Sequence, residues 1–147
     1  MTDPLPKLPQ YNQIFDLHIN EDGVVSLLKN INSSKAPGPD QIPNRILKEC
    51  ATELAPGLTC IFKTSLSSGC LPQNWTNANV TPVFKKSDKH IAENYSPVSL
   101  TSVTCKLLEY LICKHLLNHH EQNKILTNLN HGFRSGFSCE TQLIITL

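Results

Sequence analysis

Two short segments on either side of a polar loop constrain the fold most. Residues 78–84 read Ala-Asn-Val-Thr-Pro-Val-Phe, residues 95–100 read Tyr-Ser-Pro-Val-Ser-Leu, and the connecting residues 87–94 are mostly polar. β-branched and aromatic residues favour extended chain, so the pattern predicts two antiparallel strands joined as a ribbon. Pro82 and Pro97 cannot donate a backbone hydrogen bond, which predicts an edge position or a bulge for each strand.

Three lysines lie at the tip of this predicted ribbon. Lys85 and Lys86 follow the first strand, and Lys89 lies in the loop. An ammonium group on a flexible stem can meet phosphate oxygens as a point charge. A lysine pair in a polar loop is more often a solvated surface than a binding site, so the pattern alone favours the surface interpretation.

Helical periodicity covers the chain before the ribbon. Asn20 is predicted to cap a first helix whose apolar face holds Val24, Leu27, Leu28 and Ile31. Asp40 is predicted to cap a second helix, with Pro43 in its first turn, and Pro56 is expected to interrupt it before the same period restarts. The restarted apolar face is expected to hold Leu58, Ile61, Phe62, Ser65 and Leu66. Gly69 is a natural left-handed end for that helix.

The longest helical pattern follows the ribbon. Residues 102–122 carry apolar side chains on more than one face, which predicts a central buried helix. Residues 123–132 are expected to form a loop, and Ser138 to cap a short last helix. The predicted fold class is α+β, mainly helical with a small antiparallel β-ribbon. Residues 1–19 are expected to form an arm, and residues 20–147 the folded body.

Composition bounds the class of protein without identifying its function. The chain has 147 residues, of which 39% are hydrophobic and 17% are charged, so it has room for one domain with a core. No apolar run approaches the roughly 18 residues of a membrane span, and prolines interrupt residues 1–10, so we expect an intracellular protein of the nucleus or cytoplasm. Residues 61–147 carry 8 Lys or Arg against 5 Asp or Glu, while residues 1–60 carry 5 against 7. This mild imbalance is weak support for a nucleic-acid partner.

Metal and hydrolase chemistry have little support in the sequence. The six cysteines have no Cys-x-x-Cys spacing, so they are expected to be reduced thiols, most of them small apolar residues on helix faces. His115 and His119 lie four residues apart, but no third ligand has a matching spacing and no metal site is predicted. The patterns of a nucleophile elbow and of a phosphate-binding loop are both absent from the sequence.

Three blocks in a fixed order carry a family resemblance. They are Lys-Ala-Pro-Gly-Pro-Asp at 35–40, the ribbon sequences at 79–86 and 94–102, and His-Gly-Phe-Arg-Ser-Gly-Phe-Ser at 131–138. Together they resemble the reverse transcriptase of a non-LTR (LINE-type) retrotransposon, over roughly residues 24–147. The resemblance implies the fingers and early palm of a truncated right-hand polymerase.

The resemblance also implies roles for particular side chains. In this family a lysine after the first ribbon strand contacts the triphosphate of the incoming nucleotide, and here that lysine is Lys85 or Lys86. Lys89 and Arg134 are expected to bind nucleic acid, and the glycines on either side of Arg134 let the backbone approach a ligand. Ser96 stands where the family usually carries an arginine, and this neutral donor predicts weaker phosphate binding.

The family's catalytic aspartates do not fall within this chain, so no catalytic residue is assigned to it. The resemblance implies Mg²⁺ in the complete enzyme, none bound by this chain, and no polymerase activity for the chain alone. Expected partners are an RNA template, a DNA primer and the remainder of the polymerase, without membrane contact. The alternative function is a helical protein- or RNA-interaction module that self-associates through exposed apolar surface.

Overall fold

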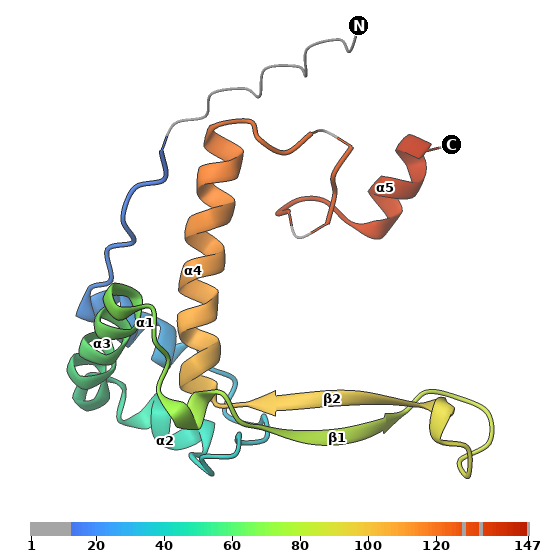
Figure 1. The fold of residues 1–147 in the computed structure, drawn as a ribbon, viewed down its shortest axis with the longest axis horizontal. Coiled ribbons are helices and arrows are strands. Elements are labelled where there is room, and N and C mark those ends of the chain that lie inside the picture. The colour runs from blue at the N-terminus through green and yellow to red at the C-terminus, as the bar shows by residue number, and fades with distance from the viewer. Residues whose placement is uncertain (1–12, 128, 133, 147) are drawn as a thin grey trace, which may run out of the picture. The chain divides into compact units, whose positions relative to one another are not determined.

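The computed structural model describes residues 13–127, 129–132 and 134–146 (Figure 1). Within these residues the order of elements is α1 (Glu21–Lys29), α2 (Asn44–Glu49), α3 (Ala51–Ser68), β1 (Ala78–Phe84), β2 (Tyr95–Thr101), α4 (Val103–Gln122) and α5 (Cys139–Thr146). Contacts divide the chain into a first unit, His18–Tyr110, and a second unit, Leu111–Leu147 together with Met1–Leu17. The predicted class, helices with one two-stranded antiparallel sheet, is confirmed. The predicted arm over residues 1–19 lies mostly outside the described residues.

Local chemistry places α1 as predicted. The side chain of Asn20 accepts a hydrogen bond from the Gly23 N–H at 2.8 Å, so it is the N-cap. Glu21 and Asp22 lie in the first turn, where the helix dipole favours negative charge. The inner face of α1 buries Val24 and Leu28.

The second predicted helix is divided differently from the prediction. The chain breaks at Cys50, between α2 and α3, and Pro56 lies inside α3 instead of interrupting it. Pro56 has no N–H, so it removes one hydrogen bond from the helix. Pro56 and Thr52, whose carbonyl would have accepted that bond, are both exposed, and water can serve the carbonyl there. Gly69 ends α3 at φ 67°, as predicted.

The predicted capping of α2 by Asp40 is wrong. Pro43 occupies the N-cap position in an extended conformation and offers no side-chain hydrogen bond. Asp40 Oδ2 instead accepts a hydrogen bond from Ser102 Oγ at 2.6 Å. A partner 62 residues away in the sequence therefore takes one carboxylate oxygen, while Oδ1 accepts from the Ile42 N–H at 3.3 Å, before α2 begins.

The core of the first unit lies between α1 and α3. The buried side chains of α3 are Ala51, Ala55, Thr59, Phe62 and Ser65. Small residues on this face let two helices approach closely, and Phe62 packs edge-on against Trp75 with ring centroids 5.9 Å apart. The prediction that Ile61 and Leu66 share the buried face is wrong, since they are 40% and 37% exposed. Close packing of small side chains has decided which face turns inward.

The predicted ribbon is confirmed. Strands β1 and β2 pair antiparallel, with Pro82 opposite Pro97 and Phe84 opposite Tyr95. A proline pair cannot exchange backbone hydrogen bonds, so it occupies a non-hydrogen-bonded position of the ladder. The ribbon extends from the helical part of the first unit (Figure 1), and most of its side chains are exposed.

The turn Pro37–Asp40, called here the Pro-Gly-Pro turn, is fastened to the start of α4. A Cβ on Gly38 would lie 2.6 Å from the carbonyl oxygen of Thr101 and 2.8 Å from Ser102 Cα, so only glycine allows this approach. Ser102 Oγ donates to Asp40 and also lies 2.8 Å from Thr104 Oγ1. Two of the sequence blocks, 35–40 and 94–102, therefore meet in space.

Helix α4 has the predicted length, but it is not buried throughout. Its buried residues are Thr104, Cys105 and Leu108, all in its first two turns. Further along, Leu116 is 41% exposed. The apolar side chains of this helix are spread around its circumference, so one packing surface cannot cover them all.

Hydrogen bonds at the start of α5 confirm the predicted cap. The hydroxyl of Ser138 accepts from the Thr141 N–H at 3.2 Å, and Thr141 Oγ1 accepts in return from the Ser138 N–H at 2.9 Å. This reciprocal pair is a capping box in which Thr141 occupies the third position of the helix.

The cysteines differ from the expectation that most are apolar residues packed on helix faces. All six are free thiols, and Cys105 alone is buried, while the other five are exposed. Cys50 and Cys70 also lie outside the helices. Within the part of the chain that the structure describes, no helix combines the length and the apolar character that a membrane crossing requires.

Candidate nucleotide and nucleic-acid contacts

The ribbon tip is held in shape by its own hydrogen bonds. The Lys85 N–H donates to the Asn94 carbonyl at 2.8 Å, which continues the ladder one residue beyond the strands. Asn94 Nδ2 donates to the Asp88 carbonyl at 2.7 Å, and the Tyr95 hydroxyl donates to the Lys89 carbonyl at 2.9 Å. The loop is therefore ordered before any ligand arrives, which lowers the entropy lost on binding.

Three lysines surround this ordered tip, as predicted. Lys85 and Lys86 are exposed, and neither takes part in the two ion pairs found among the described residues. Lys89 Nζ lies 5.7 Å from the ring centroid of Phe84, a cation–π distance, and Phe84 packs against Tyr95 with centroids 5.4 Å apart. The tip thus offers two free ammonium groups and one that rests on an aromatic ring.

Ser96 lies one residue beyond the aromatic pair, on the other face of the ribbon. Its cross-strand partner is Val83, and its side chain is half-buried. Ser96 offers no charged fork at this position, so a phosphate bound here would meet only the charge of the lysines. The expected weakening of phosphate binding stays a prediction.

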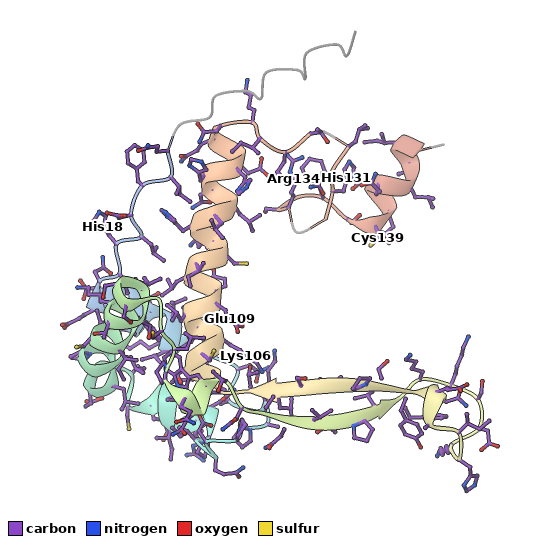
Figure 2. The ribbon with its side chains drawn as sticks, in the orientation of Figure 1. His18, Lys106, Glu109, His131, Arg134 and Cys139 are labelled. Atoms are coloured by element: carbon purple, nitrogen blue, oxygen red, sulfur yellow. The ribbon has the colours of Figure 1, made fainter. Side chains whose placement is uncertain are left out.

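Arg134, labelled in Figure 2, is already engaged by protein groups of the second unit. Its Nε and Nη2 donate to the two carboxylate oxygens of Glu121 at 2.7 and 3.0 Å. Its Nη1 donates to the carbonyls of Thr127 and Asn130, each at 3.0 Å. The side chain is 9% exposed, and the guanidinium carbon lies 4.5 Å from the centroid of the Phe137 ring.

These contacts make Arg134 the organiser of the loop between α4 and α5. The hydrogen bond with Arg134 lowers the pKa of Glu121, and the same bond raises the pKa of Arg134. Four of the five guanidinium N–H donors are used within the unit. Contact between Arg134 and nucleic acid stays a prediction, and it would have to use the remaining donor or displace Glu121.

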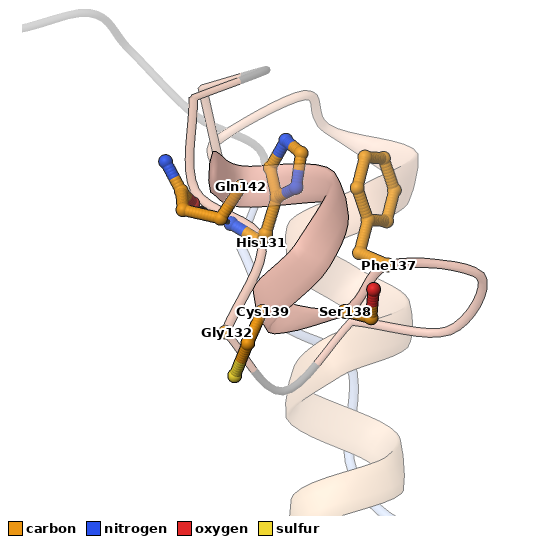
Figure 3. Close-up of a pocket in the computed structure, with 6 residues that line it drawn as sticks. All are labelled: His131, Gly132, Phe137, Ser138, Cys139 and Gln142. Carbon is orange, nitrogen blue, oxygen red and sulfur yellow. Dashed lines mark hydrogen bonds between the residues drawn. The ribbon is translucent and has the colours of Figure 1, made fainter. Parts of the chain in front are cut away.

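His131 is a residue whose role the sequence did not suggest. It is 4% exposed, its Nδ1 lies 2.7 Å from Thr141 Oγ1, and its ring meets Phe137 edge-on with centroids 4.6 Å apart. Figure 3 shows it on the wall of a pocket of about 440 Å³. The pocket is lined by His131, Gly132, Phe137, Ser138, Cys139 and Gln142. In the sequence, the one signal of the contact between His131 and Thr141 was the position of Thr141, three residues after the capping Ser138.

The structure brings the three predicted lysines together at the ribbon tip, and it places Arg134 in the second unit. His115 and His119 make other contacts: His115 Nε2 lies 2.6 Å from the Phe15 carbonyl, and His119 accepts from Asn123. Among the described residues, no three His, Cys, Asp or Glu side chains gather where they could share a metal ion.

Comparison with known proteins tests the family resemblance that the sequence blocks indicate. The chain is 29% identical over 126 residues to a probable RNA-directed DNA polymerase from transposon BS of Drosophila melanogaster. It is 28% identical over 121 residues to the RNA-directed DNA polymerase from mobile element jockey of the same species. This chain resembles non-LTR retrotransposon reverse transcriptases. That prediction is confirmed.

The similarity extends over most of this chain but over little of its relatives. The two alignments cover 85% and 82% of this chain, against 14% and 13% of the curated relatives. A Pol polyprotein from the type-1 retrotransposable element R1 of Bradysia coprophila is 26% identical over 103 residues, which is 10% of its length. No family model matches the chain.

Proposed function

We propose that this chain supplies the fingers and early palm of an RNA-directed DNA polymerase from a non-LTR retrotransposon. The observation that carries the proposal is the similarity to such polymerases over 82 to 85% of the chain. In the complete enzyme the partners are an RNA template, a DNA primer and the remainder of the polymerase. Mg²⁺ serves the transfer step there, held by aspartates that this chain does not contain.

The ribbon tip supports a role in holding the nucleotide. Lys85 and Lys86 are exposed, lie outside the ion pairs described above, and belong to a loop that hydrogen bonds already hold. Ammonium groups so placed can neutralise a triphosphate without first breaking an internal contact. Lys89 is assigned to nucleic acid, since its ammonium and the neighbouring ring of Phe84 together suit a phosphate beside a base.

The chain alone is proposed to be inactive. Phosphoryl transfer by two metal ions requires carboxylates that hold both ions close together. No suitable cluster occurs among the described residues. Without the metals, the described residues offer only lysine side chains to the charge that develops on the transferred phosphate, and these alone do not position the reacting groups.

An RNA-templated primer-extension assay with Mg²⁺ tests this proposal. It compares this chain with the same chain extended through the codons that follow in its genomic reading frame. We expect only the extended chain to incorporate nucleotides. Synthesis by this chain alone would refute the assignment of the missing carboxylates, and inactivity of both would refute the polymerase function.

The lysine assignment is tested in the extended chain. Replacing Lys85 and Lys86 together by alanine is expected to raise the KM for the nucleotide about tenfold or more, because charge-assisted contacts to phosphate are lost. Lys63→Ala is the matched control, because Lys63 is an exposed lysine on α3. An equal effect of both variants would reject a specific role for the ribbon tip.

One observation favours a second function, that of an interaction module. The consecutive residues Leu143, Ile144 and Ile145 of α5 are 62%, 71% and 53% exposed. Contiguous apolar side chains of this kind mark association surfaces. Sedimentation at increasing concentration tests this function: oligomers that Ile144→Glu disperses would support it. A monomer at every concentration would contradict self-association.

A further inference from the structure

His131 in the second unit is a buried histidine with one unpaired ring nitrogen. The residue is 4% exposed. Its Nε2 is shielded from solvent and has no hydrogen-bond partner among the described residues. Most buried polar atoms in proteins are paired, so an unpaired one calls for an explanation. Because histidine changes its charge near neutral pH, this nitrogen is a candidate for a pH-dependent role.

The other ring nitrogen joins His131 to the start of α5. Nδ1 lies 2.7 Å from Thr141 Oγ1. The Thr141 hydroxyl gives its single proton to the Ser138 carbonyl at 2.9 Å, so Nδ1 carries the proton of the neutral ring and donates it to Thr141. The same Thr141 oxygen accepts from the Ser138 N–H at 2.9 Å. His131 and the capping box of α5 therefore share one oxygen atom.

This arrangement accommodates the neutral ring but not the charged one. The imidazolium ion carries an N–H group on both nitrogens. Nδ1–H donates to Thr141, whereas an N–H at Nε2 would meet neither water nor an acceptor among the described residues. A buried charged donor without a partner carries a large desolvation cost. The closed arrangement of His131 and α5 therefore disfavours a second proton on the ring.

The positive groups near His131 act in the same direction. The ring of Phe137 contacts the His131 ring, with centroids 4.6 Å apart (Figure 3), and its centroid lies 4.5 Å from the guanidinium carbon of Arg134. The loop that carries these residues also contains the exposed Lys124. Thr141, which accepts from Nδ1, lies in the first turn of α5, the positive end of the helix dipole.

The acidic groups of the neighbouring elements do not offset this charge. Glu121 of α4 is paired with Arg134. Glu140 of α5 accepts from Ser138 Oγ at 3.3 Å. Neither carboxylate forms an ion pair with His131 among the described residues. A protonated His131 would therefore meet more positive than negative charge.

We propose that His131 is a pH-sensitive switch for the segment that joins α4 to α5. The neutral ring holds the segment and the capping box closed. When the ring takes a proton it leaves its buried position, water reaches both nitrogens, and the contact with Thr141 is lost. The inference rests on this unit alone and does not depend on the proposed polymerase function.

The direction of the pH effect follows from which form binds the proton. An exposed histidine takes up its proton near about pH 6.5, and the open form has such a histidine. The closed form binds no proton, so it is fully favoured above about pH 7.5 and is weakened as the pH falls through about 6.5. Between about pH 7.5 and about pH 5.5, the ratio of closed to open form should fall about tenfold.

Hydrogen exchange of the full chain tests the switch, with each rate divided by the intrinsic rate at the same pH. We expect the protection of the Ser138 and Thr141 amides to fall about tenfold between about pH 7.5 and about pH 5.5. Helix α3 contains no histidine, so the protection of its amides should stay constant.

Two matched variants assign the effect to one ring. His131→Asn keeps an amide donor near the position of Nδ1 but cannot titrate, so the tenfold fall in protection should disappear. His120→Asn is the control, because His120 also uses Nδ1 for a local contact, 2.6 Å from the Leu116 carbonyl. The His120→Asn variant should keep the tenfold fall.

NMR of the unaltered chain keeps the proposal testable if His131→Asn does not close its loop. The carbon resonances of the His131 ring should shift to the charged position together with the loss of amide protection in α5. Three results would overturn the inference: constant protection across the pH range, an equal fall in His131→Asn, or a ring that takes its proton while the amides of Ser138 and Thr141 stay protected.

Discussion

Each of the two units of the chain is stabilised internally by a different kind of interaction. All ten buried hydrophobic residues among those described lie in the first unit, from Ile19 to Leu108. In the described part of the second unit, His131 is the one buried residue, and its partners are polar or aromatic. The first unit has a hydrophobic core, whereas the second is organised by hydrogen bonds around Arg134 and Ser138.

This difference has a consequence for stability. Burial of apolar side chains is the dominant favourable contribution to folding, while a typical hydrogen bond adds only about 0.5–1.5 kcal/mol net. We therefore expect the first unit to supply the cooperative unfolding transition. The second unit should open locally at a lower free energy.

The largest expected effect is in the core of the first unit. Phe62 is fully buried against Trp75, so Phe62→Ala should lower the free energy of unfolding by about 3–5 kcal/mol. Urea denaturation followed by Trp75 fluorescence measures this loss. The neighbouring Ile61→Ala should cost much less, because Ile61 is 40% exposed. Similar losses for both variants would show that the first unit lacks the core described here.

A pair of glycine substitutions sharpens the comparison, because one is expected to lower the stability of the fold and the other to raise it. Gly38→Ala would place Cβ 2.6 Å from a backbone oxygen, so the turn or α4 must shift, at a cost of about 1–3 kcal/mol. Gly57→Ala has open space and lies inside α3, so it should stabilise by up to about 1 kcal/mol. Thermal unfolding distinguishes the two. A stable Gly38→Ala variant would mean that the Pro-Gly-Pro turn does not depend on close approach to α4.

The third prediction concerns the second unit alone. Arg134→Lys keeps the charge but loses the paired contact with Glu121 and the reach to two carbonyls. Amide hydrogen exchange should accelerate in the described residues between 121 and 142, with little change in the first unit. Acceleration throughout His18–Tyr110 would show that the two units unfold together, which would break the comparison.

The smallest effect is on thiol reactivity. Burial, followed by the nearby Glu109 carboxylate, raises the pKa of the Cys105 thiol, so less of the reactive thiolate forms. Of the six cysteines, Cys105 should be alkylated last, and Cys113 and Cys139 of the second unit should react early. Mass spectrometry after timed iodoacetamide treatment gives the order. Early labelling of Cys105 would place the start of α4 outside the core.

Sequence alone predicted the features that depend on neighbouring residues. Asn20 and Ser138 begin their helices and Gly69 ends its helix as expected, because a cap needs only a side chain or a backbone conformation within a few residues. The ribbon followed from β-branched residues around a polar loop, and its tip lysines followed from their place in that loop.

Features that depend on distant residues were missed. Asp40 has the chemistry of a cap, yet Ser102 competes for it, and no local pattern reveals that partner. The inward face of α3 was assigned by hydrophobicity, whereas close packing of small residues determined it. For the same reason no local pattern indicates that Asn44 and Lys106 border one pocket, because that pocket lies where residues near the turn meet α4.

The paired prolines of the ribbon bear on how the chain behaves at high concentration. At a non-hydrogen-bonded position the missing N–H groups are the ones that would point away from the partner strand. Pro82 and Pro97 therefore remove a donor from each outer edge of an exposed two-stranded sheet. A third strand from another copy would find a gap in the ladder on either side, so the ribbon resists edge-to-edge aggregation while it stays open to ligands.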